Sequence, residues 1–155
     1  MMFEGTGVDM TTEPFVTPSG TQVPAVTAET MRDVDRIAVE EVGLRLLQMM
    51  ENASRTLAHR VAATGKEPVV VVAGNGGNGG GGLACARHLD NHDVQVAVVL
   101  DRDPDMLSGA AAHQYRILDA TDVSVTGGVE ELAAFERIGV IVDALIGYGL
   151  DGPIR

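Results

Sequence analysis

A glycine-rich run is the part of the sequence best suited to chemistry. It spans Gly74–Gly82, reads GNGGNGGGG and lies between a predicted strand and a predicted helix. Glycine has no Cβ, so it allows positive φ and lets a ligand approach the backbone closely. The start of the following helix offers unpaired N–H groups and a partial positive charge, which suit a phosphate. We therefore interpret the run as a ligand-binding loop.

A second segment that could bind a ligand or take part in a reaction begins at Asp143, where a predicted fourth strand ends. In a doubly wound sheet the first strand neighbours the fourth at the switch point, and adjacent strands lie about 4.8 Å apart. Asn78 and Asp143 are therefore expected to emerge side by side at one edge. An amide oxygen and a carboxylate so placed could share a hard cation or face a substrate. The alternative is that Asp143 only caps the loop that follows.

The same glycine run also satisfies a dinucleotide-binding pattern. Gly74, Gly76 and Gly79 fit G-x-G-x-x-G, and Asp101 follows 22 residues later, at the end of the second predicted strand. In NAD-binding proteins an acid in that place holds the ribose. Asp101 could equally end its strand at the solvent edge. A P-loop is excluded, because no Gly-Lys-Ser/Thr sequence follows.

Hydrophobic periodicity indicates which elements position these residues. Residues 1–25 show no sustained period and are predicted to be a flexible tail. The segments 27–43 and 46–61 follow helical spacing, and Gly43 and Gly65 are expected to interrupt or end them. Further along, apolar runs at 69–72, 94–100, 123–125 and 140–142 alternate with helical segments at 83–89, 104–115 and 129–137. This alternation predicts one α/β domain over 26–155, a doubly wound, Rossmann-like parallel sheet with flanking helices.

The composition narrows the class of protein. The chain has 155 residues, with 22 acidic and 11 Lys and Arg side chains and a formal net charge of −11. It has no cluster of Lys and Arg for nucleic acid, and no apolar run near the roughly 18 residues of a membrane span. Its single cysteine, Cys85, cannot form an intramolecular disulfide, and residues 1–9 lack the basic start of a signal peptide. We expect a cytoplasmic protein that binds neither nucleic acid nor membrane.

Other polar residues allow more than one interpretation. His88 and His92, spaced i and i+4, could clamp zinc or could form a solvated helix face, whereas His59 has no partner at ligand spacing. Glu51 and Asn52 could line a pocket or a subunit contact, or could be the polar flank of a helix. Cys85 is expected to be a small buried residue.

Three segments resemble motifs of the NAD(P)H-hydrate epimerase family, the YjeF N-terminal domain. The glycine run and the following Ala86–Leu89 are similar to the family's G-x-G-N-N-G-G-D-G-L…A-R-x-L. Met50–Ala53 resembles its L-M-E-N-A-G segment, and Asp143–Leu150 resembles its D-A-L-F-G-T-G-L segment. The motifs occur in the family's order between Val26 and Arg155.

The resemblance implies a reaction. The family interconverts the R and S forms of hydrated NADH and NADPH, and a dehydratase then repairs the S form. We expect proton-assisted loss of the hydroxyl group and attack of water on the other face of the ring cation, which needs a proton donor and stabilisation of charge. The resemblance also implies a potassium ion at the site and a homodimer.

The resemblance assigns roles residue by residue. It makes Asn78 and Asp143 the potassium contacts, and Asp143 the acid expected nearest the chemistry. The residues that it places against the substrate are Gly77, Asn78, Gly79, Gly80, Gly81, Gly147, Tyr148, Gly149, Leu150, Asp151, Gly152 and Pro153.

The sequence departs from the family pattern in the loop and at its end. Gly77 and Gly81 stand where the family has Asn and Asp, and Ser54 replaces the glycine of the M-E-N-A-G segment. The chain stops at Arg155, before further strands of the family, so we expect a domain incomplete at its C-terminus with an unpaired sheet edge. Two alternatives to the epimerase therefore stay open: a catalytically degenerate interaction or scaffold module, and a conventional NAD-binding enzyme that uses Asp101.

Overall fold

The computed structural model describes residues 15–23 and 25–149. The described residues form two compact units, which divide between Arg45 and Leu46. The first unit contains strands β1 (Phe15–Val16) and β2 (Gln22–Val23), which pair as an antiparallel hairpin, and helix α1 (Ala28–Glu40). Thr27 caps α1 by accepting a hydrogen bond from the backbone N–H of Thr30. The hairpin lies within the predicted tail and was not foreseen. The predicted division into a tail over 1–25 and a domain over 26–155 stays a prediction.

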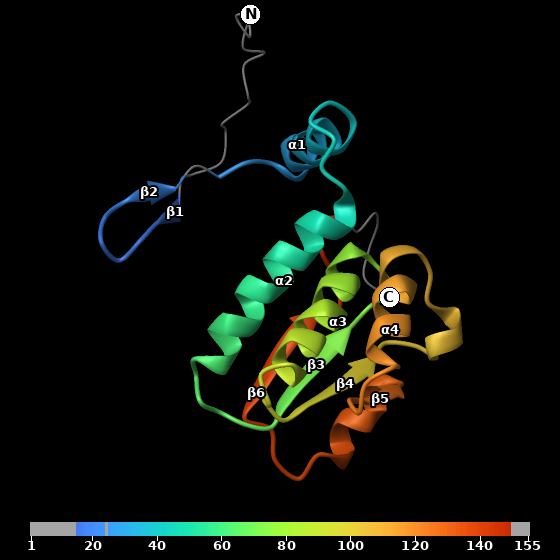
Figure 1. The fold of residues 1–155 in the computed structure, drawn as a ribbon. Coiled ribbons are helices and arrows are strands. Elements are labelled where there is room, and N and C mark those ends of the chain that lie inside the picture. The colour runs from blue at the N-terminus through green and yellow to red at the C-terminus, as the bar shows by residue number, and fades with distance from the viewer. Residues whose placement is uncertain (1–14, 24, 150–155) are drawn as a thin grey trace, which may run out of the picture. The chain divides into compact units, whose positions relative to one another are not determined.

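The second unit is built on a four-stranded parallel sheet, as the alternating pattern predicted (Figure 1). Its strands are β3 (Val69–Ala73), β4 (Val96–Leu100), β5 (Ser124–Gly127) and β6 (Val140–Ala144), in the order β5-β4-β3-β6. The first strand of the sheet therefore lies between the second and the fourth. This order confirms the doubly wound, Rossmann-like arrangement and places a switch point between β3 and β6.

Three helices of this unit lie on one face of the sheet. They are α2 (Leu46–Ala62), α3 (Gly77–Asp90) and α4 (Gly109–Leu118), and α3 contacts the sheet directly with α2 and α4 packed against it. Leu83, Leu89 and Cys85 of α3 are fully buried against β3 and β4. Burial raises the pKa of the Cys85 thiol to about 12, so Cys85 is a packing residue and no nucleophile at neutral pH. No helix in the described ranges is long and apolar enough to cross a membrane.

The opposite face of the sheet carries a smaller cluster. Val70, Val72 and Val99 are buried there, packed against Leu132 and Phe135 of the segment around η2 (Val129–Ala134). That segment is a 3-10 helix, shorter than the helix predicted over 129–137. The helix predicted over 104–115 is also divided, into the 3-10 turn η1 (Pro104–Met106) and α4, because Leu107 and Ser108 adopt an extended backbone between them.

The main polar link between α2 and α3 is a cluster centred on Glu51. Its carboxylate accepts hydrogen bonds of 2.6 and 2.9 Å from Nη2 of Arg87, and Nε2 of His88 lies 2.8 Å from Oε1. Glu51 therefore joins two helices, whereas Asn52 lies on the exposed flank of α2 and accepts a bond from Arg55. Charge-assisted hydrogen bonds of this kind fix one helix against another more firmly than neutral ones.

The cluster shifts the titration of two groups in the same direction. Desolvation opposes ionisation of Glu51, but the hydrogen bonds and charges of Arg87 and His88 outweigh it and hold the pKa below its ordinary value. Burial lowers the pKa of His88, although the carboxylate of Glu51 acts in the opposite sense. The folded state therefore binds fewer protons than the unfolded state as each group titrates, and acid favours unfolding.

We expect the free energy of unfolding, measured by urea denaturation, to fall as the pH is lowered below about 6.5 and again below about 4.5. Replacing Glu51→Gln should cost about 1 kcal/mol at pH 7, a figure reduced because Glu51 is 43% exposed. The variant should lose less further stability below pH 4.5. The exposed Glu136→Gln serves as the control and should follow the native profile; an unchanged Glu51→Gln profile would contradict the assignment.

Candidate functional site

Two loops meet at the carboxyl edge of the sheet, where β3 and β6 end. Ala73 and Ala144 are paired in register, and the backbone N–H of Gly74 donates to the carbonyl of Ala144 at 3.1 Å. Beyond them, Nδ2 of Asn78 donates to the carbonyl oxygen of Ile146 at 3.1 Å. The glycine run and the segment after Asp143 are thus brought together, 68 residues apart in sequence.

The glycine run is mostly helical, because α3 begins at Gly77. Sequence periodicity placed the start of this helix later, near Leu83. None of the glycines in Gly74–Gly82 adopts a positive φ, so the left-handed conformation that glycine allows is not used in the run. The glycines are required for close packing instead: a Cβ on Gly74 would collide with the carbonyl of Leu145, and one on Gly82 would collide with Ala144.

Gly147 lets the second loop pass directly over Asn78. A Cβ on Gly147 would lie 3.1 Å from Cβ of Asn78, which is closer than ordinary van der Waals contact. A glycine on each loop therefore allows two backbones to approach around one amide side chain. The result is a narrow polar edge formed by the start of α3 and residues 145–147.

The oxygen atoms of Asn78 and Asp143 have unused acceptor capacity. Nδ2 of Asn78 holds the second loop, and within residues 15–23 and 25–149 its Oδ1 accepts no hydrogen bond. Oδ1 of Asp143 accepts a 3.0 Å bond from the backbone N–H of Leu145, and Asp143 is an exposed residue. Asp143 projects from the sheet face opposite α3, because its strand neighbours Val142 and Ala144 are buried on the α3 side. A shared ion between Asn78 and Asp143 stays a prediction.

A contact that the sequence did not reveal joins the glycine run to α4. Oδ1 of Asn75 accepts a 2.7 Å hydrogen bond from the backbone N–H of Ser108, and its Nδ2 donates to the hydroxyl of Ser108 at 3.1 Å. Ser108 is the N-cap of α4, yet its side chain makes no capping bond within that helix. Asn75 thus aligns the starts of two helices. Sequence spacing gave no signal, since the two residues are 33 apart.

Two departures from the family pattern touch each other. The hydroxyl of Ser54 donates a 2.8 Å hydrogen bond to the carbonyl oxygen of Gly81. Ser54 is buried in α2, and it lies 3.6 Å from the place that a Cβ on Gly81 would occupy. The serine in place of glycine and the glycine in place of Asp therefore form one local contact between α2 and α3.

Asp101, the acid of the dinucleotide pattern, already has a partner. It follows β4, and its two carboxylate oxygens accept bonds of 2.8 and 2.7 Å from Nε and Nη2 of Arg102. A two-bond pair of this kind satisfies the carboxylate and would have to open before a ribose could bind. The pairing disfavours Asp101 as a ribose ligand.

The other residues predicted to contact the substrate differ in their exposure to solvent. Gly79 and Gly80 are buried in the first turn of α3, whereas Gly77, Tyr148 and Gly149 are exposed. The remaining predicted contacts, Leu150, Asp151, Gly152 and Pro153, lie outside the described residues.

Comparison with known proteins gives a consistent result. Residues 46–155 match the family model described as YjeF-related protein N-terminus. The chain is 41% identical over 146 residues to the NAD(P)H-hydrate epimerase of Dehalogenimonas lykanthroporepellens, covering 89% of this chain and 57% of that protein. It is 39% identical to the NAD(P)H-hydrate epimerase of Pirellula staleyi, covering 80% of this chain and 58% of that one.

Longer relatives and a solved structure extend the comparison. The bifunctional NAD(P)H-hydrate repair enzyme Nnr of Salinibacter ruber is 41% identical over 149 residues, which cover 85% of this chain and 28% of that protein. The crystal structure of yeast ynu0, YNL200c, superposes with a TM-score of 0.75 at 27% identity, covering 86% of this chain and 60% of that one. The chain therefore spans less than two thirds of the length of each of these four proteins.

Replacing Asn75→Ala should destabilise the protein by about 1 kcal/mol, because the N–H of Ser108 loses its acceptor. It should also speed hydrogen exchange at the amides of residues 76–82, measured by mass spectrometry. Asn75→Asp keeps the acceptor and should lie closer to the native protein. The matched control is Asn91→Ala, at an exposed asparagine after α3; equal exchange in the two alanine variants would refute the role of Asn75.

Proposed function

This chain belongs to the family of YjeF-related protein N-termini, and we propose on that premise that it acts as an epimerase of hydrated NADH and NADPH. The observation that carries the proposal is the meeting of the glycine run with the segment after β6, through the 3.1 Å hydrogen bond from Asn78 to Ile146. Through this hydrogen bond, the glycine motif and the motif that begins at Asp143 lie at the same edge of the sheet although they are distant in sequence. Curated relatives that match most of the chain are named NAD(P)H-hydrate epimerase.

The edge has the groups that such a substrate needs. The first turn of α3, from Gly77, presents backbone N–H groups and the positive end of the helix dipole, which suit the substrate's diphosphate. The exposed loop at Gly147–Gly149 offers further backbone groups. We assign substrate contacts to Gly77–Gly81 and to residues 147–153.

Asp143 is the acid that we assign to the proton-transfer step. Its Oδ1 accepts a hydrogen bond from the N–H of Leu145, and the residue is exposed near the carboxyl end of β6. A carboxyl group placed in this way can exchange a proton with the hydroxyl that leaves the hydrated ring and with the water that replaces it. The reaction inverts one carbon and involves no net oxidation or reduction.

We also propose a potassium ion at this edge, with Asn78 and Asp143 as its candidate ligands, although the Asp143 carboxylate projects from the sheet face opposite α3. Asn78 supplies an amide oxygen without a hydrogen bond in the described part of the chain, and Asp143 supplies a carboxylate oxygen, both of which are hard ligands. When bound, the ion would supply positive charge beside the substrate. Asn78 would then have two functions, because its nitrogen holds the second loop while its oxygen faces the ion.

The partners and the cellular location follow from the same proposal. The product form would pass to an NAD(P)H-hydrate dehydratase, and relatives named as bifunctional repair enzymes support such a pairing. We further propose a homodimer and a cytoplasmic location, with no binding to nucleic acid or membrane.

A non-catalytic scaffold module is the second candidate function. The observation that favours it is Gly81, which leaves the loop without the family's Asp and is bonded through its carbonyl to Ser54. Under this alternative the fold would persist without turnover. A conventional NAD-binding role is disfavoured by the pairing of Asp101 with Arg102.

A coupled assay separates these functions. Purified protein is mixed with R-hydrated NADH and an S-specific dehydratase, and recovery of NADH absorbance is followed. We expect acceleration above spontaneous epimerisation, and Asp143→Asn, which keeps an acceptor for the N–H of Leu145, should reduce it by about 100-fold. Asp101→Ala should leave the rate near that of the native protein. The absence of any acceleration by the native chain would support the scaffold instead.

Restoring the Asp that the family has at the position of Gly81 tests whether its absence limits activity. The nearest atom to a Cβ on Gly81 is Oγ of Ser54 at 3.6 Å, so the backbone at position 81 has room for the Cβ of Gly81→Asp. We expect this variant to raise the rate of the coupled assay by about tenfold, because the added carboxylate can hold a substrate hydroxyl or a proton. Glu136→Gln, at an exposed position outside the assigned contacts, is the control. A rate unchanged by Gly81→Asp would show that the missing Asp does not limit activity.

A further inference from the structure

Two exposed histidines from different elements face each other at the far end of α2. His59 lies in the last turn of α2, and His92 lies in the turn that follows α3. Their ring centroids are 5.3 Å apart and their planes are inclined by 44°. Within the described ranges neither ring makes a hydrogen bond or an ion pair.

The sequence had pointed to a different pair. His88 and His92 are spaced i and i+4, but Nε2 of His88 lies 2.8 Å from the carboxylate of Glu51 and is only 13% exposed. His88 is therefore committed to the link between α2 and α3. The tertiary structure instead gives His92 the partner His59, 33 residues away.

The separation of the rings fits a tetrahedral metal ion. A zinc–nitrogen bond of about 2.05 Å and a tetrahedral angle place the centroids of two imidazole ligands roughly 5.2 Å apart. The observed 5.3 Å agrees with that value and is also an ordinary ring-to-ring separation, so a metal ion would require rotations that aim one nitrogen of each ring at it. A square-planar or octahedral ion with adjacent imidazoles would require a separation of about 4.5 Å.

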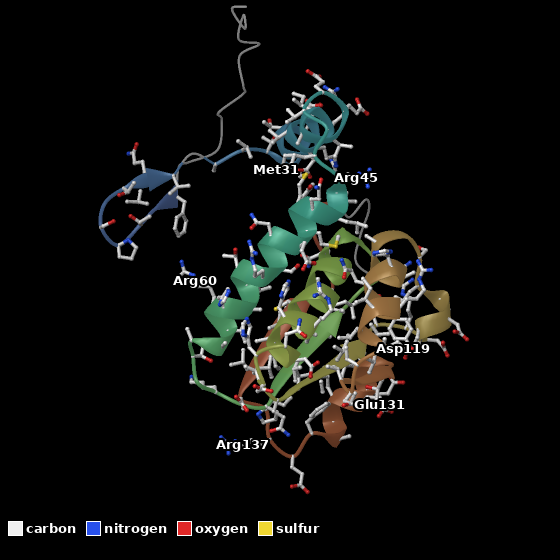
Figure 2. The ribbon with its side chains drawn as sticks, in the orientation of Figure 1. Met31, Arg45, Arg60, Asp119, Glu131 and Arg137 are labelled. Atoms are coloured by element: carbon white, nitrogen blue, oxygen red, sulfur yellow. The ribbon has the colours of Figure 1, made fainter. Side chains whose placement is uncertain are left out.

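The surroundings of the pair also suit a cation. His59 is near the C-terminus of α2 and His92 just beyond that of α3, where the helix dipole gives a partial negative charge. Arg60, the neighbour of His59, extends away from α3 (Figure 2), so its charge does not fill the space between the rings. No group of three or more His, Cys, Asp or Glu residues in the described part forms a metal site, so water would complete the coordination.

We propose that His59 and His92 form a surface binding site for a zinc ion, which ties the end of α2 to the turn between α3 and β4. The site is independent of the proposed function. It lies at the opposite end of α3 from the glycine run, and the 14 residues of that helix span about 21 Å. Zinc bound there stabilises the packing of α2 on α3, since the folded chain holds the two rings together and binds the ion more tightly than the unfolded chain does.

Zinc titration of untagged, metal-free protein tests the proposal. We expect one zinc ion per chain by calorimetry and a melting temperature that rises with zinc concentration. His59→Ala and His92→Ala should each weaken binding at least tenfold and abolish the rise in melting temperature. Both side chains are exposed, so without zinc each variant should have the melting temperature of the native protein. This measurement shows that the variants fold. His113→Ala, on α4, is the control and should bind zinc as the native chain does.

Several outcomes would overturn the site. These are the absence of saturable zinc binding by the native chain, native affinity in either His59→Ala or His92→Ala, or equal loss in His113→Ala. Replacing zinc by Co²⁺ adds a spectroscopic readout, because a tetrahedral ion shows strong visible absorption that the two alanine variants should lack. None of these measurements depends on epimerase activity.

Discussion

The close passage of two backbones at the carboxyl edge of β3 and β6 is the constraint on which the rest of the site depends. Gly74 approaches the carbonyl of Leu145, Gly82 approaches Ala144, and Gly147 crosses over Asn78. Side chains at these positions would force the loops apart and separate Asn78 from Ile146. Close packing thus requires glycine at these positions, and the exposed N–H groups at the start of α3 are a consequence of that packing.

Polar contacts from α2 and α4 hold the start of α3 in place. Ser54 bonds the carbonyl of Gly81, Glu51 bonds Arg87 one turn and a half further along, and Asn75 bonds Ser108 at the start of α4. A helix that begins with so many glycines has low intrinsic stability. Its rigidity must therefore come from tertiary contacts. The same logic would make the pair His59 and His92 a second tie at the other end of α3.

The fold was largely predictable from sequence, whereas contacts between elements were not. The β-branched run Val69–Val72, the stops at Gly43 and Gly65, and the alternation of strands and helices predicted the parallel sheet. The short 3-10 helix at Val129–Ala134 and the early start of α3 were missed, because tertiary packing overrides local propensity in segments so short or so rich in glycine. The bonds of Asn75 to Ser108 and of Arg102 to Asp101 carried no sequence signal either.

The sequence by itself determined the class of fold, the order of its elements and the two segments that form the candidate site. It did so because burial imposes period and because parallel strands send their carboxyl ends to one edge. Only the tertiary structure decided which atoms of those segments meet: Asn78 turns its nitrogen to Ile146, and His92 faces His59 rather than bonding with His88. The physical reason is that side-chain partners across elements depend on distances and rotamers, which spacing along a chain does not encode.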